Sequence, residues 1–65
     1  METSWFNLRC AAAELARVTG RSAIFDTPDG RIVVGAESID VLLGCEATGS
    51  WEMLAEFDES GACVS

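Results

Sequence analysis

Carboxylates are the side chains with which this chain could perform acid–base chemistry. It has 11 aspartates and glutamates, no histidine and no tyrosine, and its four basic residues are all arginines. A serine or cysteine nucleophile would therefore have only a carboxylate as its base. Catalysis by a carboxylate pair also needs a substrate cleft, which 65 residues can hardly enclose. We therefore expect a protein that binds a partner and does not catalyse a reaction.

Metal binding and thiol chemistry receive little support from the sequence. The three cysteines are Cys10, Cys45 and Cys63. They are widely spaced, with no histidine or Cys-X-X-Cys pair to complete a zinc site. Residues 26–37 have acids at both ends, as an EF-hand loop does, but Pro28, Gly30 and Arg31 occupy ligand and turn positions. We expect no metal or other cofactor and reduced thiols that are buried or idle, with a redox thiol or a disulfide-linked dimer as the alternative.

The chain shows no signal for export or membrane insertion. Its first residues lack the basic and apolar stretches of a secretory leader, and no apolar run approaches the ~18 residues of a membrane span. A composition that is 49% hydrophobic argues against a disordered acidic tail. We expect one folded domain over residues 1–65, located in the cytoplasm of a bacterial host cell and not bound to a membrane.

The first element that could position the carboxylates is a helix over residues 4–19. Thr3 and Ser4 are candidate N-cap residues, Gly20 is placed to end the helix, and Arg17 suits its last turn. The apolar stripe predicted to face the core consists of Trp5, Leu8, Ala11, Ala12, Leu15 and Val18.

A β-hairpin follows, with strands at residues 22–27 and 31–36. The intervening Pro–Asp–Gly at 28–30 is turn chemistry, because proline presets φ and glycine accepts left-handed conformations. Residues 38–45 are then either a short helix capped by Ser38 or a strand, since the apolar positions fit both periods. The helix is favoured.

After a loop at residues 47–50, residues 51–58 alternate as a half-buried antiparallel strand does. One predicted face holds Trp51, Met53, Ala55 and Phe57, and the other holds Glu52, Leu54, Glu56 and Asp58. A turn at 59–61 would let residues 62–64 pair back as a short edge strand. The order of elements predicts an α+β fold, in which the N-terminal helix packs on a small antiparallel β-sheet.

The net charge of −7 belongs entirely to the second half of the chain. Residues 1–31 carry four acids and four bases, whereas residues 32–65 carry seven acids and no base. Such carboxylates repel one another, and surface charge of mixed sign would serve solubility equally well. A row of them on strand 51–58 imitates a nucleic-acid backbone and suits a groove lined with arginine and lysine. The candidate partner-binding residues are Glu37, Asp40, Glu46, Glu52, Leu54, Glu56, Asp58 and Glu59.

The same side chains also have a plainer interpretation. Many acidic faces are simply solvated and serve solubility. Leu54 is either an isolated exposed apolar residue or an anchor within an acidic rim. Direct binding of nucleic acid is not expected, because four arginines form no basic stripe and the net charge repels phosphates.

The length of the chain, its alanine-rich opening helix at residues 8–18 and its acidic strand at 51–59 resemble small anti-CRISPR proteins of phages and mobile elements. The nearest likeness is to inhibitors of the type I multi-subunit CRISPR surveillance complex (Cascade), with type I-C as the suggested subclass. No diagnostic motif carries the resemblance, so it transfers no residue role. It implies DNA mimicry, in which the acidic face occupies a basic channel and excludes target DNA.

Two functional hypotheses from different classes therefore remain open. The first is an inhibitor that binds a basic nucleic-acid-binding protein or complex. The second is an antitoxin-like or accessory subunit that neutralises a basic partner within a stable complex, and a structural accessory role is a further alternative. We expect a monomer or a weak homodimer.

Overall fold

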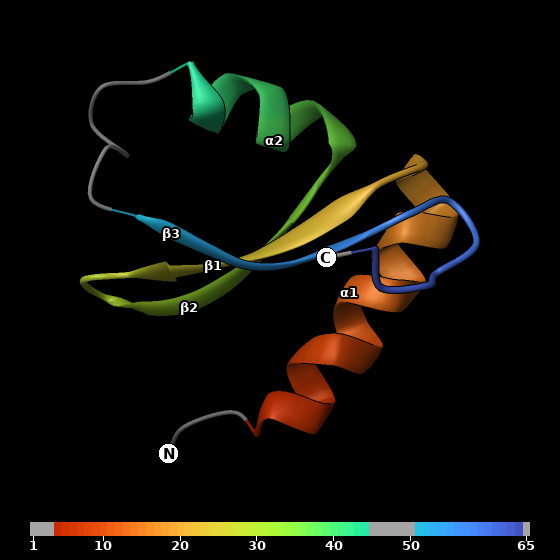
Figure 1. Ribbon diagram of the computed structural model, residues 1–65, viewed down its shortest axis with the longest axis horizontal. Coiled ribbons are helices and arrows are strands. Elements are labelled where there is room, and N and C mark those ends of the chain that lie inside the picture. The colour runs from red at the N-terminus through yellow and green to blue at the C-terminus, as the bar shows by residue number, and fades with distance from the viewer. Residues whose placement is uncertain (1–3, 45–50, 65) are drawn as a thin grey trace.

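The computed structural model describes residues 4–44 and 51–64 and consists of a three-stranded antiparallel sheet with a helix on each face (Figure 1). The elements are α1 (Trp5–Thr19), β1 (Ser22–Thr27), β2 (Gly30–Gly35), α2 (Ala36–Leu43) and β3 (Glu52–Phe57). The strand order is β2-β1-β3, and β1 pairs antiparallel with both neighbours. The predicted α+β class, with the N-terminal helix on an antiparallel sheet, is confirmed.

Local signals define both ends of α1 as the sequence indicates. Ser4 is the N-cap, and its Oγ accepts a hydrogen bond from the backbone N–H of Asn7 at 3.2 Å. Gly20 ends the helix with a positive φ of 96°, and its N–H donates to the carbonyl of Ala16 at 2.7 Å.

The face that α1 buries is narrower than the predicted stripe. Its buried residues are Leu8, Ala12 and Ala16, which are spaced four residues apart and so lie along one line of the helix. Trp5, Ala11 and Val18 are exposed, so the prediction that they face the core is wrong. The alanines lack bulky side chains, which lets the helix backbone approach the sheet closely.

The central strand β1 is covered on both faces. Ser22, Ala23, Ile24 and Phe25 are all buried. Ile24 packs with Leu8 and Phe57 beneath α1, in what we call the α1 cluster, whereas Ala23 and Phe25 pack with Ile39 beneath α2, in the α2 cluster. Ser22 is the buried polar member of the strand, and its hydroxyl donates to the carbonyl of Ala12 at 2.5 Å.

The hairpin turn forms at the predicted Pro–Asp–Gly. Gly30 has a φ of 125°, which residues with a side chain rarely adopt. The hydroxyl of Thr27 donates to the carbonyl of Gly30 at 2.6 Å and accepts from the N–H of Asp29 at 3.2 Å. These bonds hold β1 and β2 in the register that pairs Ile24 with Val33.

Helix α2 begins three residues earlier than a helix capped by Ser38 would. Its N-cap is Gly35, which has no side chain to offer a hydrogen bond. The hydroxyl of Thr19, at the end of α1, instead accepts from the N–H of Ala36 at 3.3 Å. The favoured helix is confirmed over residues 36–43, and the strand alternative is wrong.

The C-terminal segment pairs back onto β3 as predicted, but only through an isolated bridge between Phe57 and Cys63. The N–H of Val64 also donates to the carbonyl of Glu56 at 2.8 Å. Gly61 suits this return, because its φ of 84° is one that residues with a side chain rarely adopt, and a Cβ there would lie 3.2 Å from the carbonyl oxygen of Ala13. The predicted loop at 47–50 lies outside the described residues.

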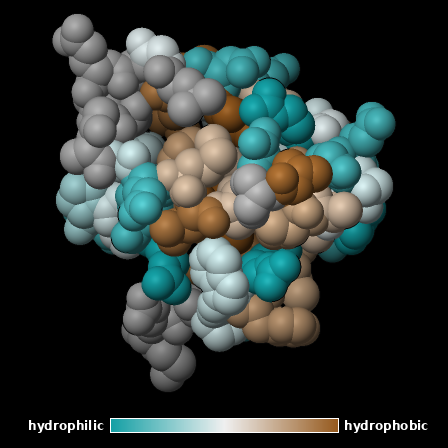
Figure 2. Space-filling view, in the orientation of Figure 1, coloured by the Kyte–Doolittle hydropathy of each residue, from teal (hydrophilic) through white to brown (hydrophobic). Residues whose placement is uncertain are grey.

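A small core leaves many apolar atoms at the surface. On the face seen in Figure 2, brown and tan apolar side chains gather toward the centre, with teal hydrophilic side chains around them. The large apolar side chains that are clearly exposed include Phe6, Val18, Val41 and Val64. Short chains bury a smaller fraction of their surface than large domains do, so some of this exposure is expected.

Enlarging Ala12 should destabilise the fold, because it is completely buried against the sheet. We expect Ala12→Leu to lower the free energy of unfolding by about 1–3 kcal/mol through overpacking. The neighbouring Ala11 is exposed, so Ala11→Leu should change the free energy of unfolding by no more than about 0.5 kcal/mol. Urea denaturation followed by tryptophan fluorescence measures both, and equal effects would contradict the close packing of α1.

Candidate functional site

A β-bulge in β3 reverses the alternation of its side chains partway along the strand. The adjacent β1 residues Ile24 and Phe25 pair with Ala55 and Met53, which leaves Leu54 as the extra residue. Ala55 therefore joins the α1 cluster with Ile24, whereas Met53 joins the α2 cluster with Phe25. Leu54 is half buried against the α1 cluster, so the exposed position that both sequence interpretations gave it is wrong.

The bulge also breaks the predicted acidic row. Glu56 lies opposite Ala23, which faces α2, whereas Glu52 lies opposite Asp26, on the α1 side of the sheet. The two glutamates are therefore on opposite faces, and the predicted division of the strand into two faces is wrong. The side chains affected are Trp51, Met53, Ala55 and Phe57 on the predicted inner face, and Glu52, Leu54, Glu56 and Asp58 on the predicted outer face.

Glu56 is bound within the molecule. Its Oε2 lies 2.7 Å from Arg21 Nη2 and accepts from Arg21 Nε at 3.0 Å. The side chain of Glu56 is only 25% exposed. Asp40 on α2 also approaches the same guanidinium, with Oδ1 3.9 Å from Nη1, but its side chain is 79% exposed. Arg21 thus links the end of β3 to α2 and neutralises part of the acidic charge there.

Asp58 is likewise committed to local structure. Its Oδ1 accepts from the hydroxyl of Ser60 at 2.5 Å, from the N–H of Ser60 at 2.9 Å and from the N–H of Ala62 at 3.2 Å. The pKa of Asp58 is lowered from 3.8, first by the Ser60 hydroxyl and then by the Ser60 N–H, with Ala62 adding less and desolvation opposing. This carboxylate shapes the turn that returns the chain to β3.

At the far end of the sheet, charged side chains form a row across the three strands. Asp26 pairs with Arg31 on one side and with Glu52 on the other. The guanidinium of Arg31 also lies over the ring of Trp5, 5.5 Å from its centroid. Glu52 is exposed and lies beside the like-charged Asp26. Because the two carboxylates repel each other, contact with an external cation would be favourable there.

Glu37 and Glu59 complete the candidate carboxylates within the described residues. Glu37 lies in the first turn of α2 and Glu59 in the turn after β3, and both are exposed. Neither forms an ion pair or side-chain hydrogen bond with the residues that the structure describes. The remaining candidate, Glu46, lies outside those residues.

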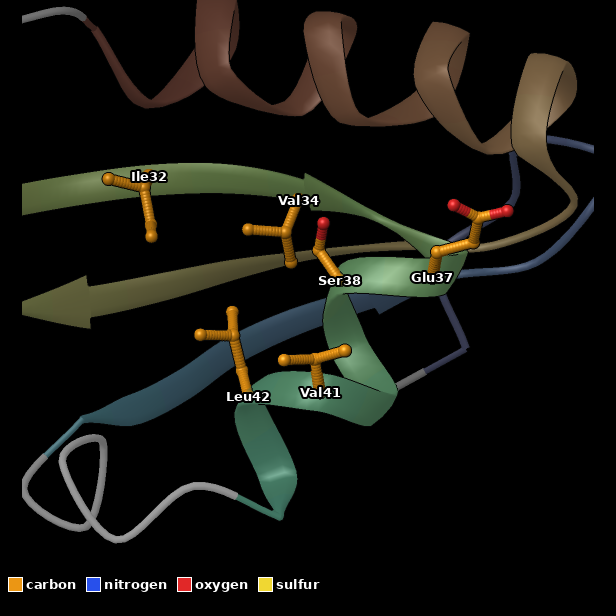
Figure 3. Close-up of a pocket in the computed structure, with 6 residues that line it drawn as sticks. All are labelled: Ile32, Val34, Glu37, Ser38, Val41 and Leu42. Carbon is orange, nitrogen blue, oxygen red and sulfur yellow. The ribbon is translucent and has the colours of Figure 1, made fainter.

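The structure adds a groove that the sequence did not reveal. It is shallow, encloses about 430 Å³, and lies between β2 and α2 (Figure 3). Its lining residues are Ile32, Val34, Glu37, Ser38, Val41 and Leu42. Figure 3 shows the branched side chains of Ile32 and Val34 turned toward α2, with those of Val41 and Leu42 turned toward the strand. Val41 is 70% exposed, and the periodicity of the helix alone did not reveal that its side chain lines a groove.

The described residues show no metal site and no membrane-spanning helix. Among them, no group of three or more histidine, cysteine or carboxylate side chains could hold a metal ion. None of the helices described is long and apolar enough to cross a bilayer. Comparisons with family models, with curated proteins and with solved structures find no match to this chain. Its function must therefore be inferred from its own residues.

Neutralising Glu56 should destabilise the protein, whereas neutralising Glu52 should not. Glu56→Gln removes the charge that Arg21 binds, and we expect a loss of about 1 kcal/mol in the free energy of unfolding. Glu52→Gln relieves repulsion from Asp26 and should be neutral or slightly stabilising. Chemical denaturation distinguishes the two, and an equal loss for both would contradict the bulged register.

The turn after β3 should contribute stability that is lost in acid. Because the pKa of Asp58 is lowered in the folded state, its contribution is present above about pH 4 and disappears as the pH falls through the folded pKa. Ser60→Ala removes the largest cause of the shift, so the Asp58 pKa should rise toward 3.8 and the acid loss should shrink. An NMR titration of the carboxyl carbon measures this, and the exposed Ser38→Ala serves as control. An unchanged Asp58 pKa in Ser60→Ala would refute the account.

Proposed function

We propose that this protein is an anti-CRISPR-like inhibitor that binds a basic nucleic-acid-binding surface of a CRISPR effector complex and excludes target DNA by mimicry. The observation that carries the proposal is the charge of residues 32–65, which hold seven acids and no base. Glu37, Glu52 and Glu59 in this segment are exposed and have no ion-pair partner among the described residues. Their charge is available to arginines and lysines of another protein.

The proposed contact surface differs from a single acidic strand. Glu56 and Asp58 are engaged by Arg21 and by the turn at residues 58–62, so they contribute to folding first. The available carboxylates come from three separate elements: Glu37 from α2, Glu52 from β3 and Glu59 from the following turn. A partner that reads charge and shape, as a DNA-binding channel does, would meet side chains held by a folded scaffold and not by a flexible tail.

Exposed charge supplies encounter rate and specificity more than affinity. A salt-sensitive association is therefore expected, because exposed charges are screened within about 8–10 Å at physiological ionic strength. The exposed apolar side chains favour a second candidate, an antitoxin-like or accessory subunit held in a stable complex. Complex formation that persists at high salt would favour this second function over the mimic.

The location of the charge can be tested separately from its amount. The triple variant Glu37→Gln, Glu52→Gln and Glu59→Gln removes three carboxylates of the acidic half. Its matched control is Glu2→Gln, Glu14→Gln and Asp29→Asn, all in the charge-balanced part of the chain, which reduces the net negative charge by the same three units. We expect the first variant to lose most of its ability to block target-DNA binding by a purified type I CRISPR surveillance complex, whereas the control retains it. An electrophoretic mobility-shift competition measures both.

Two outcomes would overturn the proposal. Equal losses in both triple variants would mean that only total charge matters, which is not mimicry by a defined surface. Full inhibition by the first variant, or no inhibition by the wild-type protein, would remove the role assigned to the acidic half. Thermal denaturation of all three proteins checks that folding is unaffected, which we expect because none of the substituted carboxylates that the structure describes is buried.

A further inference from the structure

The two edges of the sheet are protected to different extents. The outer side of β3 receives the C-terminal segment, through the bridge from Phe57 to Cys63 and the hydrogen bond from Val64 to Glu56. On the other side, β2 pairs only with β1, and no described segment pairs with its outer edge. Alternate N–H and C=O groups of an antiparallel edge strand point outward, so β2 presents a row of groups that can pair with another strand.

The sequence of β2 lacks the usual protection of an edge. Its residues Ile32, Val33 and Val34 are consecutive, β-branched and half exposed. Proteins commonly block such edges with lysine, proline or a bulge, and β2 has none of the three, with Arg31 as its one charge. An open apolar strand of this kind either aggregates or is covered by a partner.

The groove between β2 and α2 lies beside this edge and adds an apolar surface to it. Ile32 and Val34 form its strand side, and Val41 and Leu42 form its helix side (Figure 3). A strand added to β2 would place every second side chain on the groove side of the sheet, beside Ile32 and Val34. Apolar side chains at those positions would bury the exposed surface of Val41.

The charge around the groove selects a basic occupant. Glu37 is its charged lining residue, and no basic side chain lines it. Arg21, which approaches α2 at Asp40, is already bound by Glu56. Since Glu37 follows Gly35 at the end of β2, a strand running antiparallel to β2 would begin with a basic side chain near Glu37 and continue with apolar ones. A second copy of the chain is disfavoured, because each copy carries a net charge of −7.

We infer that the outer edge of β2 and the adjoining groove bind an extended segment of the partner protein by strand addition, with alternate apolar side chains in the groove and a basic side chain at Glu37. This inference rests on the proposed function and deepens it, since it names a source of affinity that exposed carboxylates alone do not supply. Main-chain hydrogen bonds give the contact strength, and the groove with Glu37 gives it selectivity.

The probe for this inference is a short capped peptide in which lysine is followed by three valines at alternate positions, separated by threonines. Titration into the isotope-labelled protein should shift amide resonances of β2 and α2 and slow hydrogen exchange at β2. Replacing the lysine with glutamate, or methylating alternate backbone nitrogens of the peptide, should abolish binding. Shifts centred on another surface, or equal binding of the modified peptides, would overturn the inference.

Matched variants of the protein test the two sides of the groove. Val41→Ser and Glu37→Gln should each weaken peptide binding by roughly three- to tenfold. Val18→Ser and Glu14→Gln are their controls, because both are exposed residues of α1 outside the groove, and they should change nothing. Equal effects of groove and control variants would contradict the inference. Sedimentation that reveals a dimer lost on Val41→Ser would also overturn it, since a second copy would then occupy the edge.

The outcomes separate this inference from the function on which it rests. If the protein blocks DNA binding by the CRISPR complex but Val41→Ser inhibits as well as the wild type and no peptide binds, the strand-addition site is wrong and the mimic stands. If the peptide binds β2 as described but the protein inhibits no CRISPR complex, the site stands and the proposed function fails.

Discussion

Burial of β1 on both of its faces organises the molecule. The chain is too short for two separate cores, so the α1 and α2 clusters share this strand, with Ile24 on one side and Phe25 on the other. Such burial requires close approach, which the small side chain of Ala12 permits and the hydroxyl of Ser22 secures by binding its carbonyl. Four consecutive residues of β1 are buried, whereas β3 has two buried residues, Ala55 and Phe57, and β2 has none.

The bulge in β3 reconciles this shared strand with the two clusters. An uninterrupted strand would have turned Met53, Ala55 and Phe57 to one face, leaving Leu54 as the apolar side chain that β3 offers to the helix on the other face. The extra residue at Leu54 changes the phase, so Ala55 reaches the α1 cluster and Met53 the α2 cluster. The same change separates Glu52 from Glu56, and it thereby sorts the carboxylates into those that stabilise the fold and those that remain available.

The sheet edges carry the functional implications. The carboxylate of Asp58 holds the turn through which the C-terminal segment returns to β3 and pairs with the end of that edge, at Glu56 and Phe57. No described segment pairs with the outer edge of β2. This edge lies beside an apolar groove whose lining includes Glu37. Exposed carboxylates can steer a basic partner toward the protein, and the open edge of β2 can bind that partner. The two features lie on neighbouring elements, and their combination suits an interaction protein.

The elements with local signals were predictable from the sequence. Ser4 and Gly20 mark the ends of α1 by hydrogen bonds to residues within one turn, and the Pro–Asp–Gly turn sets the hairpin in the same way. The class of fold and the acidic character of the second half follow from such signals and from composition. The start of α2 was misplaced because the hydroxyl that binds its first N–H comes from Thr19, far back along the chain.

Tertiary structure alone decided which carboxylates are free. The alternation of residues 51–58 predicts a single acidic face only if the strand is regular, and regularity depends on how β3 aligns with β1. That alignment is set by the two clusters, which form from residues distant in sequence. The partnership of Glu56 with Arg21, 35 positions apart, and the open edge of β2 arise in the same way, from strand order and register. The local sequence pattern predicts neither the Glu56–Arg21 pair nor the open edge, because both depend on how separate elements are placed relative to one another.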